Sequence, residues 1–142
     1  MNAMQAKVKE FHAKFMGTDP DQPTIPDEDV QKLRLRLIDE EIREFAEASA
    51  SGDLPAAIKE LCDLLYVVLG TANAYGIDIE PFFDEVHRSN MSKLWNDGAS
   101  HKDPFGKVLK PPTYSPANIE GVLAGSSVDV LLSKKESRAD AV

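Results

Sequence analysis

Four carboxylates of this 142-residue chain are spaced so that they could bind a metal ion together. Glu41 and Glu44 are three residues apart in one predicted helix, and Glu60 and Asp63 are three apart in the next. Because residues three apart lie on one face of a helix, each pair presents two carboxylates on the same face. Both pairs fall among apolar residues of their helices, so we expect all four to point inward. Burying unpaired carboxylates is costly, and a cation among them is therefore expected.

The ligand types favour a hard cation. All four candidates are oxygen donors without His or Cys, which favours Mg²⁺, with Mn²⁺ as a second choice, over Zn²⁺. A di-iron carboxylate bundle is disfavoured because it places His three residues after Glu on two helices. The remaining alternative is that the acidic run is a solvated face. That alternative explains Asp39, Glu40 and Glu47, but not Glu41 and Glu44, which fall among aliphatic residues.

Apolar periodicity predicts helices that carry these residues, and Gly or Pro lies near each junction. The predicted helices span about 2–16, 27–51, 54–75 and 80–95. No stretch alternates convincingly as a strand. The sequence therefore predicts an all-α protein of the four-helix-bundle type, with one domain over 1–125 and a disordered tail at 126–142. The third helix is apolar nearly all round, which predicts that a homodimer or tetramer completes the fold.

Composition excludes several classes of protein. A net charge of −8 disfavours DNA or RNA as a partner, because nucleic-acid binding depends on neutralising phosphates with Lys and Arg. No apolar run approaches the roughly 20 residues that span a bilayer, so no membrane is expected as a partner. The lone cysteine, Cys62, and the absence of a signal-like N-terminus predict a cytoplasmic location.

Two blocks of the sequence resemble a known family. The string EEIRE at 40–44, followed by ELCD at 60–63, is similar to the E-E-x-x-E and E-x-x-D motif of the MazG-like, all-α nucleoside triphosphate pyrophosphohydrolases. A second block, VHRSNMSK at 86–93 with FGKVLKP at 105–111, is also similar to MazG-like proteins. That superfamily includes dimeric dUTPases and phosphoribosyl-ATP pyrophosphohydrolases.

The resemblance implies hydrolysis of a nucleoside triphosphate to the monophosphate and pyrophosphate, with Mg²⁺ held by Glu41, Glu44, Glu60 and Asp63. The physical reading agrees, because divalent cations balance the charge of a triphosphate and a free carboxylate can deprotonate the attacking water. Glu40, next to Glu41 in the sequence, is the candidate for that base. The alternative is that Glu40 is an ordinary surface glutamate.

Polar groups of the second block could bind the substrate. Asn90 and Lys93 fall in the apolar stripe of the fourth predicted helix, where they need partners. We count Lys93 among the catalytic candidates, for contact with phosphate, and Asn90 is expected to contact sugar or phosphate oxygens. Lys107 and Lys110 could close over the phosphates as a lid. The alternatives are a hydrogen-bond network between helices and solvated lysines.

The nucleobase is predicted to contact aromatic residues, of which His12, Phe15 and Trp95 are the first candidates, although such residues are more often plain core. Because compact relatives include enzymes that act on dUTP, dUTP is the leading substrate. Two alternatives stay open at this point. One is the phosphoribosyl-ATP reaction of histidine synthesis, and the other is a non-enzymatic helical dimerisation module.

Overall fold

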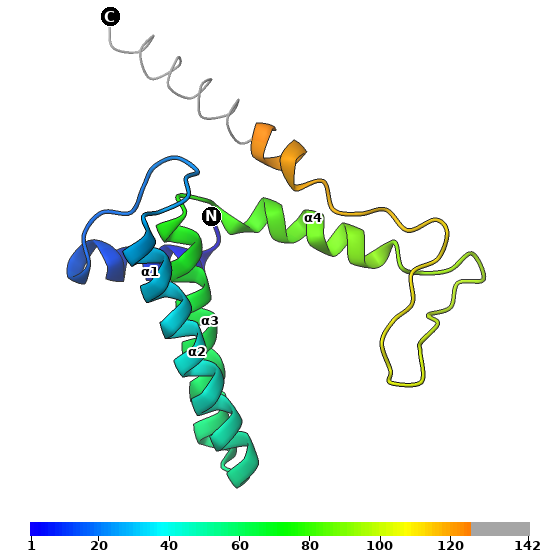
Figure 1. The fold of residues 1–142 in the computed structure, drawn as a ribbon, viewed down its shortest axis with the longest axis horizontal. Helices are drawn as coiled ribbons and strands as arrows, with labels where there is room; N and C mark the ends of the chain where they lie inside the picture. The colour runs from blue at the N-terminus through cyan, green and yellow to red at the C-terminus, as the bar shows by residue number, and fades with distance from the viewer. Residues whose placement is uncertain (126–142) are drawn as a thin grey trace, which may run out of the picture. The chain divides into compact units, whose positions relative to one another are not determined.

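The computed structural model describes residues 1–125 (Figure 1), and the predicted disordered tail lies outside them. This part contains no strand, and an isolated antiparallel bridge joins Lys102 to Val108. The predicted all-α class is therefore confirmed. The helices are α1 (Ala3–Phe15), α2 (Glu28–Ser51), α3 (Leu54–Ala74) and α4 (Ile79–Met91), followed by a short helical segment at 119–125. No helix within 1–125 is long and apolar enough to cross a membrane.

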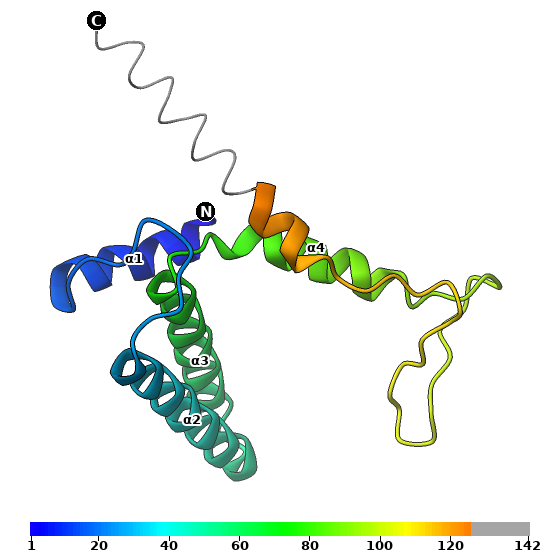
Figure 2. The same ribbon diagram turned by 45° about the horizontal axis from the view of Figure 1, so that its top comes forward.

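Local sequence signals define the tight connection between α2 and α3. Asp27 and Asp53 cap the two helices, each accepting a hydrogen bond from the backbone N–H three residues later. Gly52 ends α2 with a left-handed φ of 73°, a conformation that glycine adopts without strain. With only Gly52 and Asp53 between them, α2 and α3 fold back on each other as an antiparallel hairpin (Figures 1 and 2).

The chain divides into two units, Met1–Ile79 and Glu80–Val142, which we describe separately. The expectation of one domain over 1–125 stays a prediction. In the first unit, α1 crosses the C-terminal end of α3 (Figure 2). There the Gln5 amide donates to Asn73 Oδ1 (2.9 Å) and to the Ile77 carbonyl (2.7 Å), while its oxygen accepts from the Ile79 N–H. These bonds satisfy the polar groups of a fully buried side chain.

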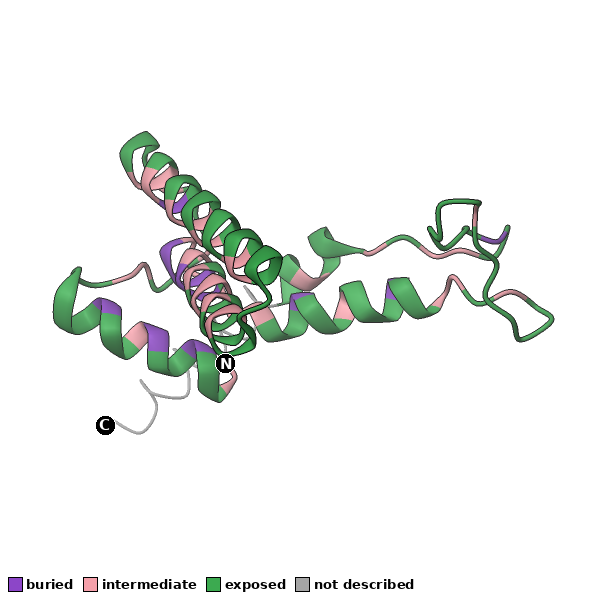
Figure 3. Ribbon diagram, turned by 90° about the horizontal axis from the view of Figure 1, so that it is seen from below, coloured by how far each residue is buried: buried purple, intermediate pink, exposed green. Residues whose placement is uncertain are grey.

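Burial is confined to one end of the first unit. Buried residues gather on α1 and on the C-terminal end of α3, whereas the part of the hairpin near Gly52 is mostly exposed (Figure 3). The exposed side chains of α3 include large apolar ones, from Leu54 (67% exposed) to Val68 (42% exposed). We call the set Leu54, Ile58, Leu61, Leu65 and Val68 the α3 apolar face.

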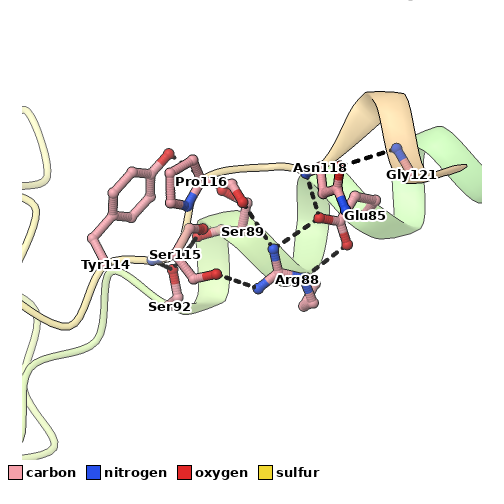
Figure 4. A network of polar contacts seen from close by, with 9 residues as sticks. All are labelled: Glu85, Arg88, Ser89, Ser92, Tyr114, Ser115, Pro116, Asn118 and Gly121. Atoms are coloured by element: carbon pink, nitrogen blue, oxygen red, sulfur yellow. Dashed lines mark hydrogen bonds and ion pairs between the residues drawn. The ribbon is translucent and has the colours of Figure 1, made fainter.

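In the second unit, a chain segment after α4 returns along that helix (Figure 4). Arg88 donates two hydrogen bonds to Glu85 (2.7 and 2.8 Å), and Glu85 also accepts from the backbone N–H of Asn118 (2.7 Å). The Arg88 hydrogen bonds and the Asn118 N–H lower the pKa of Glu85 to about 2. The Ser115 N–H donates to Ser92 Oγ (2.9 Å), so hydrogen bonds fix this segment at several points.

Candidate functional site

Three carboxylates on the facing helices of the hairpin come together. Glu41 of α2 and Glu60 and Asp63 of α3 each offer an oxygen, and these atoms lie within 4.8 Å of one another. The side chain of Glu60 is 13% exposed and that of Asp63 is 42% exposed. The short Gly52–Asp53 connection sets the register that places Glu41 opposite the other two. We call these three residues the carboxylate cluster.

The carboxylate cluster fits a divalent cation. Oε2 of Glu41 is buried and has no hydrogen-bond partner, which is costly for a carboxylate oxygen. Partial burial, followed by the negative charges of Asp63, Glu44 and Glu60, raises the pKa of Glu41. A hard cation would satisfy the orphaned oxygen and offset the repulsion, and three oxygen donors within reach of one point are typical ligands for such an ion.

Glu44 does not join the cluster. Its side chain is exposed, so the prediction that all four carboxylates point inward is wrong for this residue in the single chain. The physical reason is that α3 covers only one side of α2, and Glu44 lies outside the covered arc. Its charge still raises the pKa of Glu41, so it lies close to the cluster.

Lys59, which sequence reasoning missed, balances part of the negative charge. Its ammonium donates to Glu60 (2.9 Å) and to Asp63 (2.7 Å), and the hydrogen bonds to Asp63 and then Glu60 raise the pKa of Lys59. The spacing of four residues between Lys59 and Asp63 could have indicated this ion pair, because residues four apart lie on the same face of a helix. Because the lysine side chain is 64% exposed, it can leave the carboxylates without burial cost.

A pocket of about 510 Å³ extends from the carboxylate cluster to the aromatic residues of α1. Glu41 and Asp63 line it, together with Phe11, Phe15 and Tyr66. The centre of the Phe11 ring lies 4.7 Å from the centre of the Phe15 ring. It lies 5.8 Å from the centre of the Tyr66 ring, which it meets edge to face. The pocket volume falls within the usual range for small-molecule sites, about 300 to 1,000 Å³. An organic ligand would suit these two ends if its aromatic part stacked on the rings and its anionic part were bound to the carboxylate cluster through a divalent cation.

Two buried basic side chains, His12 and Arg34, also line this pocket. His12 Nδ1 lies 2.8 Å from an oxygen of Asp19, which fixes the ring orientation. Arg34 Nη2 donates to the Val67 carbonyl (2.8 Å), and Nε donates to Thr71 Oγ1 (3.2 Å). Burial lowers the pKa of Arg34, and the charge of Asp19 opposes that shift.

Gly70 provides the space that His12 and Arg34 occupy. A Cβ at this position would lie 2.5 Å from Arg34 Nη2 and 2.9 Å from His12 Nε2, which no side chain tolerates without a shift. Sequence reasoning identified His12 but missed Arg34 and Gly70. An arginine in an amphipathic helix is expected to be exposed, and no sequence pattern marked the gap in α3 that admits it.

The remaining site residues predicted from the sequence lie on α2 or in the second unit. Glu40 is exposed on α2 and lies outside the carboxylate cluster. Asn90 is also exposed, so the expectation that it lies in a core-facing stripe is wrong. It accepts a hydrogen bond from Lys93 Nζ (2.7 Å), an exposed contact between residues three apart that does not join two helices. Asn90, Lys93, Trp95, Lys107 and Lys110 all belong to the second unit.

Trp95 is half-buried, and its indole N–H is buried without a hydrogen-bond partner. It lines a separate pocket of about 290 Å³ with residues such as Asp97 and Pro111. Lys107 and Lys110 are exposed, and Lys110 Nζ lies 4.5 Å from the centre of the Tyr114 ring. Tyr114 was not among the residues singled out from sequence.

The chain is similar to a known enzyme family. A protein-family model described as phosphoribosyl-ATP pyrophosphohydrolase matches residues 8–90, which include all of α2 and α3 and therefore the carboxylate cluster. No curated protein matched the chain.

Proposed function

The chain belongs to the phosphoribosyl-ATP pyrophosphohydrolase family, within the MazG-like all-α superfamily, and from this premise we propose that it converts a nucleoside triphosphate to the monophosphate and pyrophosphate. The family consists of metal-dependent enzymes that hydrolyse phosphoric anhydride bonds. A purely structural role as a dimerisation module, which the sequence left open, is therefore disfavoured.

The observation that carries the proposal is the convergence of Glu41, Glu60 and Asp63 beside a pocket. These residues would hold Mg²⁺, or Mn²⁺ as the alternative, with nearby Glu44 as a fourth ligand. Such an ion supplies charge neutralisation for the phosphate oxygens of the substrate.

Glu40 stays our candidate for the general base. Its exposed carboxylate lies outside the carboxylate cluster, so its lone pairs are available to a water molecule.

The pocket supports binding of the organic part of the substrate. Phe11, Phe15 and Tyr66 offer aromatic surfaces on which a nucleobase can stack, and stacking on such side chains contributes about 1 to 3 kcal/mol per base. His12 and Arg34 add polar contacts at the same site. We propose dUTP as the first substrate to test. Phosphoribosyl-ATP is an equally consistent candidate, and the description of the matched family favours it.

A second copy of the chain is the proposed occupant of the α3 apolar face. Monomeric proteins rarely leave contiguous apolar surfaces larger than a few hundred Å² exposed. A two-fold axis would place the same face of a second protomer opposite, which buries both. The molar mass in solution, measured by light scattering, tests this proposal for wild type and Leu61→Glu. A monomeric wild type would contradict it, and a tetramer would indicate a further interface.

A pyrophosphate-release assay tests the proposed reaction. Wild type is incubated with dUTP, the other common nucleoside triphosphates and phosphoribosyl-ATP, with Mg²⁺ and with EDTA. We expect Mg²⁺-dependent formation of monophosphate and pyrophosphate in equal amounts from at least one substrate. Asp63→Asn should lose this activity, whereas Glu47→Gln, on the same helix as Glu41 but outside the carboxylate cluster, should keep it. Release of pyrophosphate from none of the substrates would refute the proposal.

A further inference from the structure

Lys59 contacts the carboxylates that would hold the divalent cation. Its ammonium donates to both oxygens of Glu60 (3.0 and 2.9 Å) and to Oδ2 of Asp63 (2.7 Å). An ammonium can only donate and an ionised carboxylate can only accept, so the direction of these bonds is fixed. All three N–H groups of Lys59 therefore have an acceptor on the carboxylate cluster, and two of its three residues are bonded to the lysine.

A divalent cation at the carboxylate cluster would compete with this ammonium. Mg²⁺ lies about 2.0 to 2.1 Å from its oxygen ligands. Because Lys59 contacts both oxygens of Glu60, a cation bound to either of them would lie within about 5 Å of the ammonium nitrogen. Positive charges at such a distance repel each other, and here they also share the same acceptor oxygens. Cation binding should therefore displace Lys59.

The lysine is the partner that can move. The side chain of Lys59 is 64% exposed, whereas that of Glu60 is 13% exposed. Ion pairs of exposed lysines are weak, because water solvates the ammonium nearly as well as the carboxylate does. The four-carbon stem of lysine is also flexible, so the ammonium can change its acceptor while the backbone of α3 stays in place.

A bound nucleotide would supply the acceptor that the displaced ammonium needs. Three carboxylates outweigh one Mg²⁺, so the cluster with its cation would still be negative and would repel a triphosphate. Phosphate oxygens that share the cation with Glu60 and Asp63 must lie beside these residues. A flexible lysine that contacts both carboxylates can reach such oxygens, and an ammonium binds phosphate through charge-assisted hydrogen bonds.

We propose that the Lys59 ammonium competes with the divalent cation for Glu60 and Asp63 and transfers to a phosphate oxygen of the nucleotide when cation and nucleotide bind. This inference rests on the proposed function and adds a substrate-binding residue to it. The cation alone must displace the lysine into water, whereas the cation with a nucleotide offers it a new anionic partner. Lys59 therefore couples metal binding to substrate binding, and the two should bind more tightly together than separately.

Lys59→Gln, at an exposed position, tests both parts of the proposal. Without nucleotide, the dissociation constant of Mg²⁺, measured by calorimetry, should fall about tenfold, because hydrogen bonds to charged groups no longer have to be broken. At saturating Mg²⁺, the dissociation constant of inorganic tripolyphosphate and the Michaelis constant of the best nucleotide should rise about tenfold, because a phosphate contact is lost. An ion pair with a purely structural role would not shift these constants in opposite directions.

Lys32→Gln is the matched control. Lys32 forms an exposed ion pair with Glu28 at the same spacing of four residues (2.7 Å), on α2 and outside the carboxylate cluster. Its loss should change none of the constants. Lys59→Arg keeps the positive charge, so it should keep Mg²⁺ binding as weak as in wild type and retain most of the affinity for tripolyphosphate.

Unchanged constants in Lys59→Gln would overturn the inference. Tighter Mg²⁺ binding with unchanged tripolyphosphate binding would also overturn it, because the lysine would then act only as a fixed counter-charge. If both constants shift as expected but wild type hydrolyses no nucleotide, the phosphate-binding role of Lys59 stands and the proposed reaction is refuted. Hydrolysis by wild type with unchanged constants in the variant would refute the inference and leave the proposed reaction intact.

Discussion

Replacing Glu41 with Gln should make the protein more stable than wild type in the absence of a divalent cation. In the presence of the cation, the same variant should be less stable than wild type. In EDTA, a Glu41 carboxylate oxygen lies within 4.8 Å of oxygens of Glu60 and Asp63, so both carboxylates repel its ionised form. Two like charges at about 4 Å repel by about 1 kcal/mol in water and more in partly buried sites. Lys59 offsets part of this repulsion. We therefore expect Glu41→Gln to gain about 1 to 2 kcal/mol, or about 3 to 8 °C in Tm.

Saturating Mg²⁺ should reverse the order. A ligand at 100 times its dissociation constant stabilises the folded state by about 2.7 kcal/mol. Wild type should gain this amount, whereas Glu41→Gln has lost a charged oxygen ligand and should gain little. Thermal unfolding across a Mg²⁺ titration at constant ionic strength measures both effects.

Glu47→Gln is the control, because Glu47 is an exposed carboxylate of the same helix outside the carboxylate cluster. It should change stability by less than about 0.5 kcal/mol in either condition. A metal-free Glu41→Gln that is less stable than wild type would refute the argument from charge repulsion. An undiminished response of this variant to Mg²⁺ would refute the assignment of Glu41 as a ligand.

Three further predictions concern other parts of the chain. Glu44→Ala should lower turnover by about 100-fold with unchanged helix content in circular dichroism, because loss of a metal ligand costs at least as much as loss of an outer-sphere partner; full activity would exclude Glu44 as a ligand. Gly70→Ala should destabilise the protein by up to about 2 kcal/mol in denaturant titrations, since overpacking costs about 1 to 3 kcal/mol and the helix gains only about 1 kcal/mol; a more stable variant would contradict the close contact with Arg34. The lowered pKa of Glu85 stabilises the second unit at pH values above the ordinary glutamate pKa, and this contribution should be lost as the pH falls towards about 2. Fluorescence of Trp95, the one tryptophan of the chain, should report that acid transition, and Glu85→Gln should weaken its pH dependence.

The helices were predictable because their signals are local. Asp27 and Asp53 as caps and Gly52 as a stop lie within a few residues of the bonds that they make. Helical periodicity also placed Glu60 and Asp63 on one face of α3. Periodicity tells which residues share a face but not which face another helix covers, and the orientation of Glu44 was therefore predicted wrongly.

The contacts missed from sequence join residues that are distant along the chain. The burial of Arg34 depends on space left by Gly70, thirty-six residues later. The hydrogen bond between Ser89 and Tyr114 joins residues that are twenty-five positions apart. Neither arginine in an amphipathic helix nor tyrosine in a proline-rich loop carries a pattern that predicts such a partner.

The hairpin between α2 and α3 restricts how this sequence can change in length. Glu41 and Asp63 stand eleven residues before and after Gly52, so each is about 16 Å along its helix from the turn. Deleting one residue from either arm would rotate its carboxylate by about 100° and move it by about 1.5 Å relative to the opposite helix. Only paired insertions or deletions of whole turns in both arms would keep the oxygens together. Natural length variants of this hairpin are therefore expected to differ symmetrically about the glycine.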